Sequence, residues 1–194
     1  MTRPAGKCYF TGMGSDVPDK FRLFYLDDAV LRRKAAPVAA FGEPERALVE
    51  AMAALMVAHR GVGLAAPQVG ILQRIVVIHP GLLPPGVDTV LVNPEIVHRS
   101  REKTEEEEGC LSLLSVAVAM PRPAQIAVRY RDLGGREREL EANDFGARAL
   151  IHEIEHLDGI LFIDHLSRLK RKAVTDRFRK LYRELGLEAA GAAK

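Results

Sequence analysis

The stretch from Ala149 to Gly159, ALIHEIEHLDG, determines what the rest of the chain has to build. On an α-helix, residues four apart share one face, so His152 and His156 can point at one divalent metal ion. Glu153 lies between them and can stay close to a water molecule at that ion. Apolar residues surround the motif, which predicts a buried helix, and buried imidazoles and carboxylates need a compensating partner. A metal ion would be that partner.

The limits of this helix can be read from its flanks. Asn143 or Asp144 can cap its start, and no proline interrupts the run that follows. Gly159 can adopt the left-handed conformation that ends a helix. An HExxH pattern also arises by chance on exposed helices, and two histidines are too few ligands for a metal site.

Three positions could supply the third ligand. One large class of metalloproteases has a histidine three residues after the glycine, but this chain has Phe162 there. Glu184 lies in a strongly basic segment that we expect to be exposed. Cys110 is the better candidate, because a thiolate suits both zinc and ferrous iron, and Gly109 lets the backbone approach a substrate. The alternative for a lone cysteine is a small buried apolar residue.

Three blocks of sequence together resemble the peptide deformylase family. In chain order they are GVGLAAPQ (Gly61–Gln68), EGCLS (Glu108–Ser112) and HEIEHLDG (His152–Gly159). The similarity extends from about Asp27 to about Leu166. It implies an α+β fold, with mainly antiparallel sheets packed around a central HExxH helix and a C-terminal helix. It also implies a metal-dependent hydrolase.

Residue chemistry and the resemblance together define an expected metal centre. The expected ligands of one divalent ion are Cys110, His152 and His156. Ferrous iron is the native ion by resemblance, and zinc or nickel can replace it. Glu153 would take the proton of the attacking water and pass it to the leaving amine. By resemblance, the Leu111 backbone N–H and the Gln68 amide would meet the charge on the formyl oxygen.

The resemblance implies N-formyl-methionyl peptides as substrates, with formate and a free amino terminus as products. The Val62 and Gly63 backbone would pair with an extended peptide, which is binding with little regard for sequence. By position, a methionine pocket would involve Val62, Phe145, Ala149 and the His152 ring, with the stem of Arg148 nearby. A cramped site would exclude acyl groups larger than formyl.

A buried ion pair is also implied behind the metal. Glu108 matches a family carboxylate that pairs with an arginine shortly downstream, and Arg122 has that place. The pair would brace the Cys110 loop. The chain departs from the family pattern, which usually has proline, glutamine and aspartate, at Leu114, Ile151 and Glu155. We expect the last two changes to alter hydrogen bonding around the ligands without abolishing activity.

Two other functions fit parts of the sequence. A generic zinc endopeptidase would need a third ligand other than Cys110 and would cut internal bonds. A non-catalytic ribosome-associated module would keep the basic C-terminal segment but would not need Glu153. The presence of both Cys110 and Glu153 favours the deformylase.

Length and composition indicate one globular domain. The chain has 194 residues, of which 47% are hydrophobic and 28% charged, enough for a proper core. No apolar run is long enough to span a membrane, and a net charge of +2 does not by itself indicate a nucleic-acid partner. Two cysteines give no disulfide framework and fit the reducing cytoplasm. We expect a cytoplasmic monomer.

Residues 1–20 are expected to form a loosely held extension, because glycines and prolines break any periodicity and no signal-peptide core is present. Cys8 belongs to this extension and receives no role. The catalytic domain is expected over residues 21–166. It opens with a segment like the family's, although Leu26 stands where proline is usual.

Periodicity predicts the main elements of that domain. Pro44–His59 reads as an amphipathic core helix, followed by the first block as a loop. Strands are expected over 74–78 and 87–92, and a solvated charged loop over 101–107. A hairpin with a polar edge strand is expected over 125–130 and 136–141, turning at Gly134-Gly135.

Residues 167–194 are expected to form a basic C-terminal helix and tail. From Leu166 to Arg183 the chain carries eight Lys/Arg and one Asp. Its apolar side would comprise Leu166, Leu169, Val174, Phe178 and Leu181. Such a run is most often a solvated face; by resemblance to some family members, the alternative is docking on ribosomal RNA.

Overall fold

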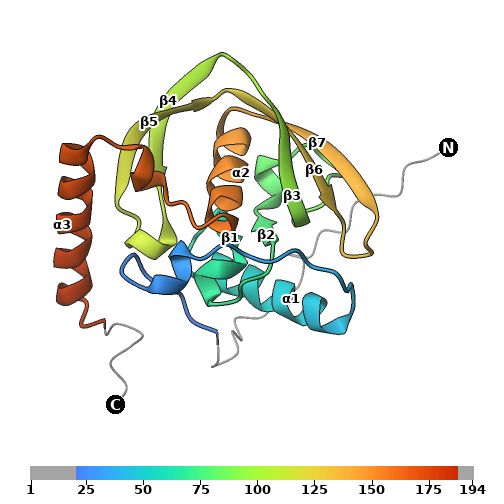
Figure 1. Cartoon of the computed structure of the whole chain (residues 1–194), viewed down its shortest axis with the longest axis horizontal. Helices are drawn as coiled ribbons and strands as arrows, with labels where there is room; N and C mark the ends of the chain where they lie inside the picture. Colours follow the sequence, from blue (N-terminus) through green and yellow to red (C-terminus); the bar gives the residue numbers. More distant parts are fainter. Residues whose placement is uncertain (1–20, 188–194) are drawn as a thin grey trace.

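The computed structural model describes residues 21–187 and shows the α+β fold that the sequence predicts (Figure 1). The extension expected over 1–20, with Cys8, and the last residues, 188–194, lie outside the described part. The larger sheet is antiparallel, in the order β1 (Gly63–Ala65), β2 (Ile75–Ile78), β3 (Val90–Arg99), β6 (Gln125–Arg131) and β7 (Glu137–Asn143). The smaller sheet pairs β4 (Lys103–Gly109) with β5 (Ala117–Pro123). The helices are α1 (Glu43–Ala58), α2 (Asp144–Leu157) and α3 (Arg168–Glu184).

Short 3-10 helices occupy several connections between these elements. They are η1 (Ala29–Arg32), η2 (Ala66–Val69), η3 (Pro80–Leu82), η4 (Leu111–Leu113) and η5 (Phe162–His165). The first sequence block, expected as a loop, therefore contains strand β1 and helix η2.

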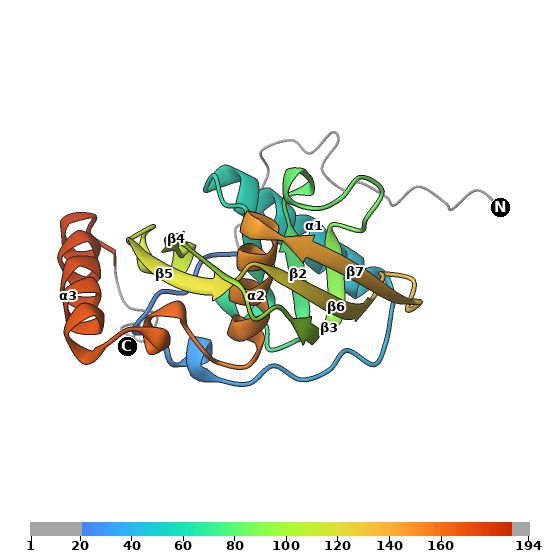
Figure 2. The same ribbon diagram turned by 90° about the horizontal axis from the view of Figure 1, so that it is seen from above.

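Two helices cover opposite faces of the larger sheet. In β2, Val76 and Ile78 belong to the apolar cluster that includes α2 residues, whereas Ile75 and Val77 belong to the cluster that includes α1 residues. This alternation follows from the two-residue period of a strand. Both faces of β2 are buried, and α2 is held in the middle of the molecule, between the two sheets (Figures 1 and 2).

Helix α2 begins and ends where its flanking residues predict. Asn143 is the N-cap residue, although its side chain makes no capping hydrogen bond. Gly159 follows the helix with φ 74°, and a β-carbon there would lie 2.6 Å from the Arg32 carbonyl oxygen. Glycine therefore satisfies both the left-handed conformation and the close chain approach. The helix is buried along most of its length, as expected from the apolar residues around the motif.

The β6–β7 hairpin and α1 also agree with the sequence. Strand β7 lies at the edge of the larger sheet and carries exposed charged residues, which protect an edge from further pairing. In α1, Leu48, Met52 and Met56 are buried, as expected for a core helix, and His59 is its C-cap residue.

One predicted loop is a strand, and one predicted strand has different bounds. The charged stretch expected as a solvated loop over 101–107 is mostly strand β4, whose ladder with β5 leaves most of its side chains in solvent. The strand expected over 87–92 starts later, at Val90, and runs on to Arg99. It passes Pro94 because its pairing with β6 shifts register between Val92 and Glu95, where a proline breaks no regular ladder.

Helix α3 packs against the smaller sheet through a third apolar cluster. Val174 and Phe178 are buried there with residues of η5 and β5, and Leu166 and Leu181 are partly buried. Leu169, expected on the apolar side, is 80% exposed instead. It precedes Val174, the first buried residue of the helix, by more than one turn, and so lies beyond the part of α3 that packs on the third cluster. No helix among residues 21–187 has the length and apolar character needed to cross a membrane.

Candidate metal centre

The three predicted ligands converge at the start of η4 and on α2. The potential ligand atoms of Cys110, His152 and His156 all lie within 4.8 Å of one another, and all three residues are buried. The Cys110 Sγ is 3.3 Å from the His156 Nε2. The two histidines are one helical turn apart, with ring centroids separated by 4.9 Å. One thiolate and two imidazoles form a donor set that suits zinc or ferrous iron.

His152 is held in the tautomer that a metal ligand needs. Its Nδ1 lies 2.8 Å from Glu108 Oε1, and because a carboxylate only accepts, Nδ1 donates in this hydrogen bond and Nε2 is the ring nitrogen that can bind a cation in place of a proton. Burial lowers the pKa of His152, but the neighbouring Cys110 and the Glu108 carboxylate outweigh it and raise the pKa well above its usual range. The site therefore favours a positive charge beside Cys110, as a metal ion would supply.

The other side of the ligand pair is apolar. Phe162, which stands where a different protease class has its third histidine, stacks on the His152 ring with centroids 5.9 Å apart.

Burial, followed by repulsion from His152, lowers the pKa of His156 well below its usual range, so His156 is neutral. Its Nδ1 has no hydrogen-bond partner among residues 21–187.

Glu108 and Arg122 form the predicted ion pair behind the ligands. Arg122 Nε and Nη2 donate to the two Glu108 oxygens at 2.8 and 2.7 Å. Arg148 Nη1 adds a third contact at 3.3 Å. Burial alone would raise the pKa of Glu108, but its hydrogen bonds from Arg122 and His152 lower the pKa to about 2. This carboxylate is therefore ionised and orients His152 at any ordinary pH.

Glu153 lies directly against strand β1. A β-carbon added to Gly63 would be 2.6 Å from Glu153 Oε1, so only glycine leaves room for this carboxylate. The other oxygen, Oε2, is buried and has no partner within the described part of the chain. Burial raises the pKa of Glu153 to about 7, with His152 opposing and Glu108 reinforcing the shift. A carboxyl group with this pKa can accept and return a proton near neutral pH.

The Gln68 amide is oriented by its own loop. Its Oε1 accepts the Ala65 N–H at 2.8 Å, which turns Nε2 toward the Cys110 Sγ, 3.6 Å away, and the Ser112 Oγ, 3.2 Å away. The donor end of the amide therefore faces the metal centre. Ser112 is fully buried and was missed at the level of sequence, although it is the last residue of the EGCLS block.

A pocket of about 350 Å³ opens onto this centre. The predicted residues that line it are Val62, Gly63, Gln68, Gly109, Cys110, Leu111, Phe145, Arg148, Ala149, His152 and Glu153. His156 lies behind them, 1% exposed. The Arg148 guanidinium points into the protein, because it also donates to the Met120 and Thr104 carbonyl oxygens. Sequence reasoning missed Arg60, Glu107, Ser115 and Ala117, which also line the pocket.

The departures from the family pattern near the ligands, at Leu114, Ile151 and Glu155, have different surroundings. Leu114 has φ 52° at the end of η4. Ile151 is buried in the apolar cluster between α2 and the larger sheet. Glu155 accepts two hydrogen bonds from Arg122, at 2.8 and 2.9 Å, and so extends the ion pair behind the metal ligands.

The match to a known protein family covers the part of the chain that contains these residues. The family model described as Polypeptide deformylase matches residues 20–172. The chain belongs to this family. The peptide deformylase of Acidobacterium capsulatum is 45% identical over 157 residues, which are 80% of this chain and 92% of that protein.

Solved deformylase structures share the fold. A peptide deformylase from Legionella pneumophila matches with a TM-score of 0.79 and 37% identity, over 87% of this chain and 98% of that one. The Ehrlichia chaffeensis peptide deformylase in complex with actinonin matches with a TM-score of 0.78 and 35% identity, over 84% of this chain and 98% of that one.

Family membership establishes the reaction. This deformylase is a metal-dependent hydrolase that removes the formyl group from the amino terminus of polypeptides, giving formate and a free amino terminus. The generic endopeptidase and the non-catalytic module, which the sequence left open, are thereby set aside.

Proposed function

We propose that Cys110, His152 and His156 hold one catalytic divalent ion and that the adjoining pocket binds the formyl-methionyl end of a peptide. The convergence of a buried thiol and two imidazoles beside a carboxylate with an unpartnered oxygen carries this proposal. A bound divalent ion would supply a Lewis acid that lowers the pKa of a water molecule and polarises the formyl group.

Glu153 acts as the proton carrier. It accepts a proton from the attacking water at Oε2, which has no competing partner among the described residues. Water oxygen adds to the formyl carbon, the carbon–nitrogen bond breaks, and Glu153 returns the proton to the leaving amine. The products are formate and the amine. Burial and a pKa of about 7 fit both halves of this cycle.

Two donors stabilise the formyl oxygen as it gains charge. The Gln68 Nε2 faces the site because its carbonyl end is occupied by the Ala65 N–H. Leu111 is the first residue of η4, where N–H groups have no partner within the helix. Donors fixed before the reaction need no reorganisation when the charge develops.

The peptide lies along the pocket in an extended conformation. The backbones of Val62, Gly63 and Gly109 pair with it, which makes binding tolerant of sequence. Its methionine side chain contacts Val62, Phe145, Ala149 and the Arg148 stem, all of which line the pocket. The Ehrlichia chaffeensis relative was solved in complex with actinonin, which is consistent with a peptide substrate.

Ferrous iron is the proposed native ion, with zinc or nickel able to replace it. The ligand set accepts all three, so metal supply decides occupancy as much as affinity does. Metal analysis of protein purified without oxygen tests this assignment. Iron at one equivalent supports it, whereas stoichiometric zinc in active anaerobic preparations contradicts it.

Acyl selectivity tests the proposed site. Formate release from formyl-Met-Ala-Ser should be lost in Cys110→Ala, because the metal loses its thiolate. The matching acetyl peptide should remain uncut by the wild-type protein, because the pocket at the metal admits only the smaller acyl group. Equal rates on formyl and acetyl peptides would contradict the proposed geometry.

We further propose that α3 and the segment 167–194 contact ribosomal RNA. Within residues 21–187, the side chains of Arg168, Lys170, Arg177 and Arg183 have no hydrogen bond or ion pair, so their charges are available. Salt-sensitive ribosome binding should weaken in the double variant Arg177→Glu, Arg183→Glu. Unchanged binding, or equal weakening in the control Arg99→Glu, Arg101→Glu, would contradict this contact.

We also propose that the enzyme is monomeric and works in the cytoplasm. Within residues 21–187, the large exposed apolar side chains come from separate segments of the chain: Val57 in α1, Val97 in β3, Phe145 in α2, Leu169 in α3, and Val62, Ile71, Ile160 and Leu185 between elements. A ligand thiolate such as Cys110 needs a reducing compartment to stay unoxidised. Light scattering at micromolar concentration should give the mass of one chain; a dimer would contradict the first part.

A further inference from the structure

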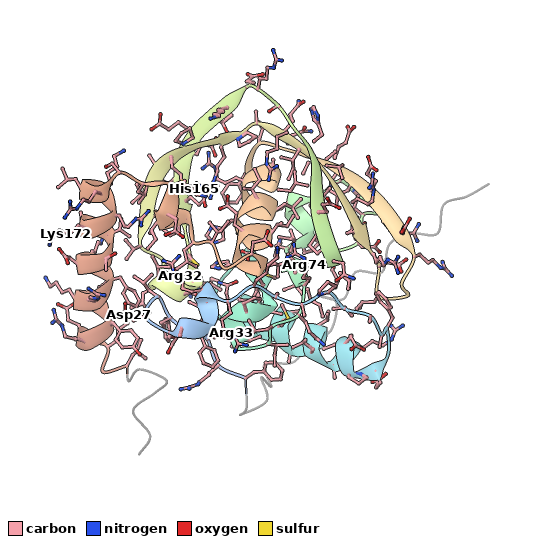
Figure 3. The ribbon with its side chains drawn as sticks, viewed as in Figure 1. Asp27, Arg32, Arg33, Arg74, His165 and Lys172 are labelled. Carbon is pink, nitrogen blue, oxygen red and sulfur yellow. The ribbon has the colours of Figure 1, made fainter. Side chains whose placement is uncertain are left out.

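A continuous polar chain connects the protein surface to a metal ligand. His165, the last residue of η5, has its Nε2 2.9 Å from Glu155 Oε1. Glu155 accepts two hydrogen bonds from Arg122, and Arg122 donates two more to Glu108. Glu108 in turn accepts the Nδ1 proton of His152. Figure 3 shows His165 in the region between α3 and α2, at the outer end of this chain.

Arg122 is the centre of the chain and uses both edges of its guanidinium. One edge meets Glu108 and the other meets Glu155, each through two hydrogen bonds of 2.7 to 2.9 Å. The exposed fraction is 5% for the Arg122 side chain, 3% for Glu108 and 16% for Glu155. Paired bonds at both edges leave the guanidinium no freedom to rotate. The position of Glu108, and through it of His152, therefore depends on Glu155.

Glu155 also balances charge beside the metal ligands. The cluster holds two cations, Arg122 and Arg148, and two anions, Glu108 and Glu155. Without the Glu155 charge, Arg122 and Arg148 would share Glu108 alone, and the cluster would carry a net positive charge. Positive charge at this place opposes a divalent cation and weakens Glu108 as the acceptor for His152.

His165 orients Glu155 from the outer side. Because a carboxylate only accepts, the His165 Nε2 must donate to Glu155 Oε1, the same oxygen that accepts from Arg122 Nη1. The His165 side chain is 42% exposed, so its contribution is smaller than that of the buried pair. It lies two residues before Ser167, the N-cap of α3, and thus joins the base of α3 to the metal centre.

We propose that Glu155 and His165 are positioning residues that slow the loss of the catalytic metal by holding Arg122 and Glu108 in place. This inference rests on the metal site proposed above. It concerns metal retention, which is measured without substrate, so it can fail or hold independently of the deformylation mechanism.

The test measures metal release from zinc-loaded protein into excess colorimetric chelator. Groups bonded directly to metal ligands typically change affinity by about 10- to 100-fold, and these residues lie further out, so about threefold to tenfold faster release is expected for Glu155→Gln. A smaller acceleration is expected for His165→Leu. Glu155→Asp restores the charge and should release metal more slowly than Glu155→Gln. His165→Gln restores an N–H donor and should release metal more slowly than His165→Leu.

Matched substitutions elsewhere serve as controls. Glu50→Gln removes an exposed carboxylate on α1, and His98→Leu removes an exposed histidine on β3 that has no side-chain partner among residues 21–187. Both should release zinc at the wild-type rate. Wild-type release in Glu155→Gln and His165→Leu would overturn the proposal, as would equal acceleration in the controls or no rescue by the conservative variants.

Kinetic constants separate positioning from a general loss of structure. With saturating metal, Glu155→Gln should lower kcat and leave KM for formyl-Met-Ala-Ser close to wild type, because Glu155 does not line the pocket. If Glu155→Gln fails to fold, the surface substitution His165→Leu decides the question by itself. A change confined to KM would overturn the proposal.

Discussion

The charged residues of the metal centre and those of helix α3 differ in burial and in their partners. At the centre, Glu108, Arg122 and Arg148 are buried and joined by hydrogen bonds of 2.7 to 3.3 Å. On α3 the charges are exposed, and those that pair do so with exposed partners, such as Lys172 with Asp176. Buried pairs are costly to break, whereas exposed pairs contribute little. The same residue types should therefore respond very differently to substitution in the two regions.

Among the charged residues, the largest expected effect is the loss of Glu108. Glu108→Gln leaves Arg122 and Arg148 buried with one carboxylate between them, and breaking a buried ion pair in this way costs about 3–5 kcal/mol. Chemical denaturation of the metal-free protein measures the free energy of unfolding. The control is Glu106→Gln on the same strand, where the side chain is exposed and the change should be within about 0.5 kcal/mol. Similar losses in both variants would remove the distinction between buried and exposed charges.

The acid sensitivity of metal-free protein sharpens the same point. The pKa of Glu108 in the folded protein is about 2, below the ordinary value of 4.5. A lowered pKa stabilises the fold above the ordinary value, and this stabilisation, at most about 3 kcal/mol, is lost as pH falls from 4.5 toward 2. Glu108→Gln should flatten the dependence of unfolding free energy on pH in this window. An unchanged slope would contradict the claim that the ionised Glu108 and its hydrogen bonds stabilise the fold.

A single methyl group tests how closely Glu153 is packed. Gly63→Ala places a β-carbon 2.6 Å from Glu153 Oε1, so the carboxylate must move. A displacement of about 1 Å at a reacting group can cost about 100-fold in rate, and kcat for formate release should fall accordingly. Gly42→Ala, just before α1 and outside the pocket, is the matched control, because its nearest contact would be an ordinary 3.6 Å to Pro44 Cδ. Equal losses in both variants would contradict a specific role for the Gly63 contact.

The smallest effect is expected on the outer face of α3. Arg177→Ala removes an exposed charge without a partner in the described structure, and should change stability by less than about 0.5 kcal/mol and leave kcat unchanged. Phe178→Ala, one residue on, removes a side chain that is 1% exposed and should cost about 3–5 kcal/mol. Thermal unfolding measures the change in stability of both variants. A large effect of Arg177→Ala would mean that the outer face is not merely solvated.

Much of the metal centre was predictable because its signal is local. His152, Glu153 and His156 share one helix, so their spacing alone specifies their geometry. The chemistry of a thiolate ligand favoured Cys110, and the resemblance supplied the Glu108–Arg122 pair; all three residues lie far from the helix in sequence. The roles of these residues in the reaction stay predictions until the variants are measured.

The missed features depend on contacts that local sequence does not encode. Four successive glutamates, residues 105–108, have low strand propensity, and β4 forms because its backbone pairs with β5 beyond η4. The contact between Glu155 and His165 requires η5 to turn back toward α2. The exposure of Leu169 depends on where the neighbours of α3 end, which periodicity cannot predict.

The most direct test of the account is single-turnover formate release by iron-loaded protein, compared between wild type and Glu153→Gln, with metal content measured in the same samples. General acid–base catalysis typically contributes about 10²- to 10⁴-fold, so the variant should lose activity by that amount while keeping one equivalent of metal. Glutamine retains the size of the side chain, so the fold and the three ligands stay in place. A variant that keeps its metal and turns over at the wild-type rate would contradict the assignment of Glu153 and, with it, the proposed mechanism.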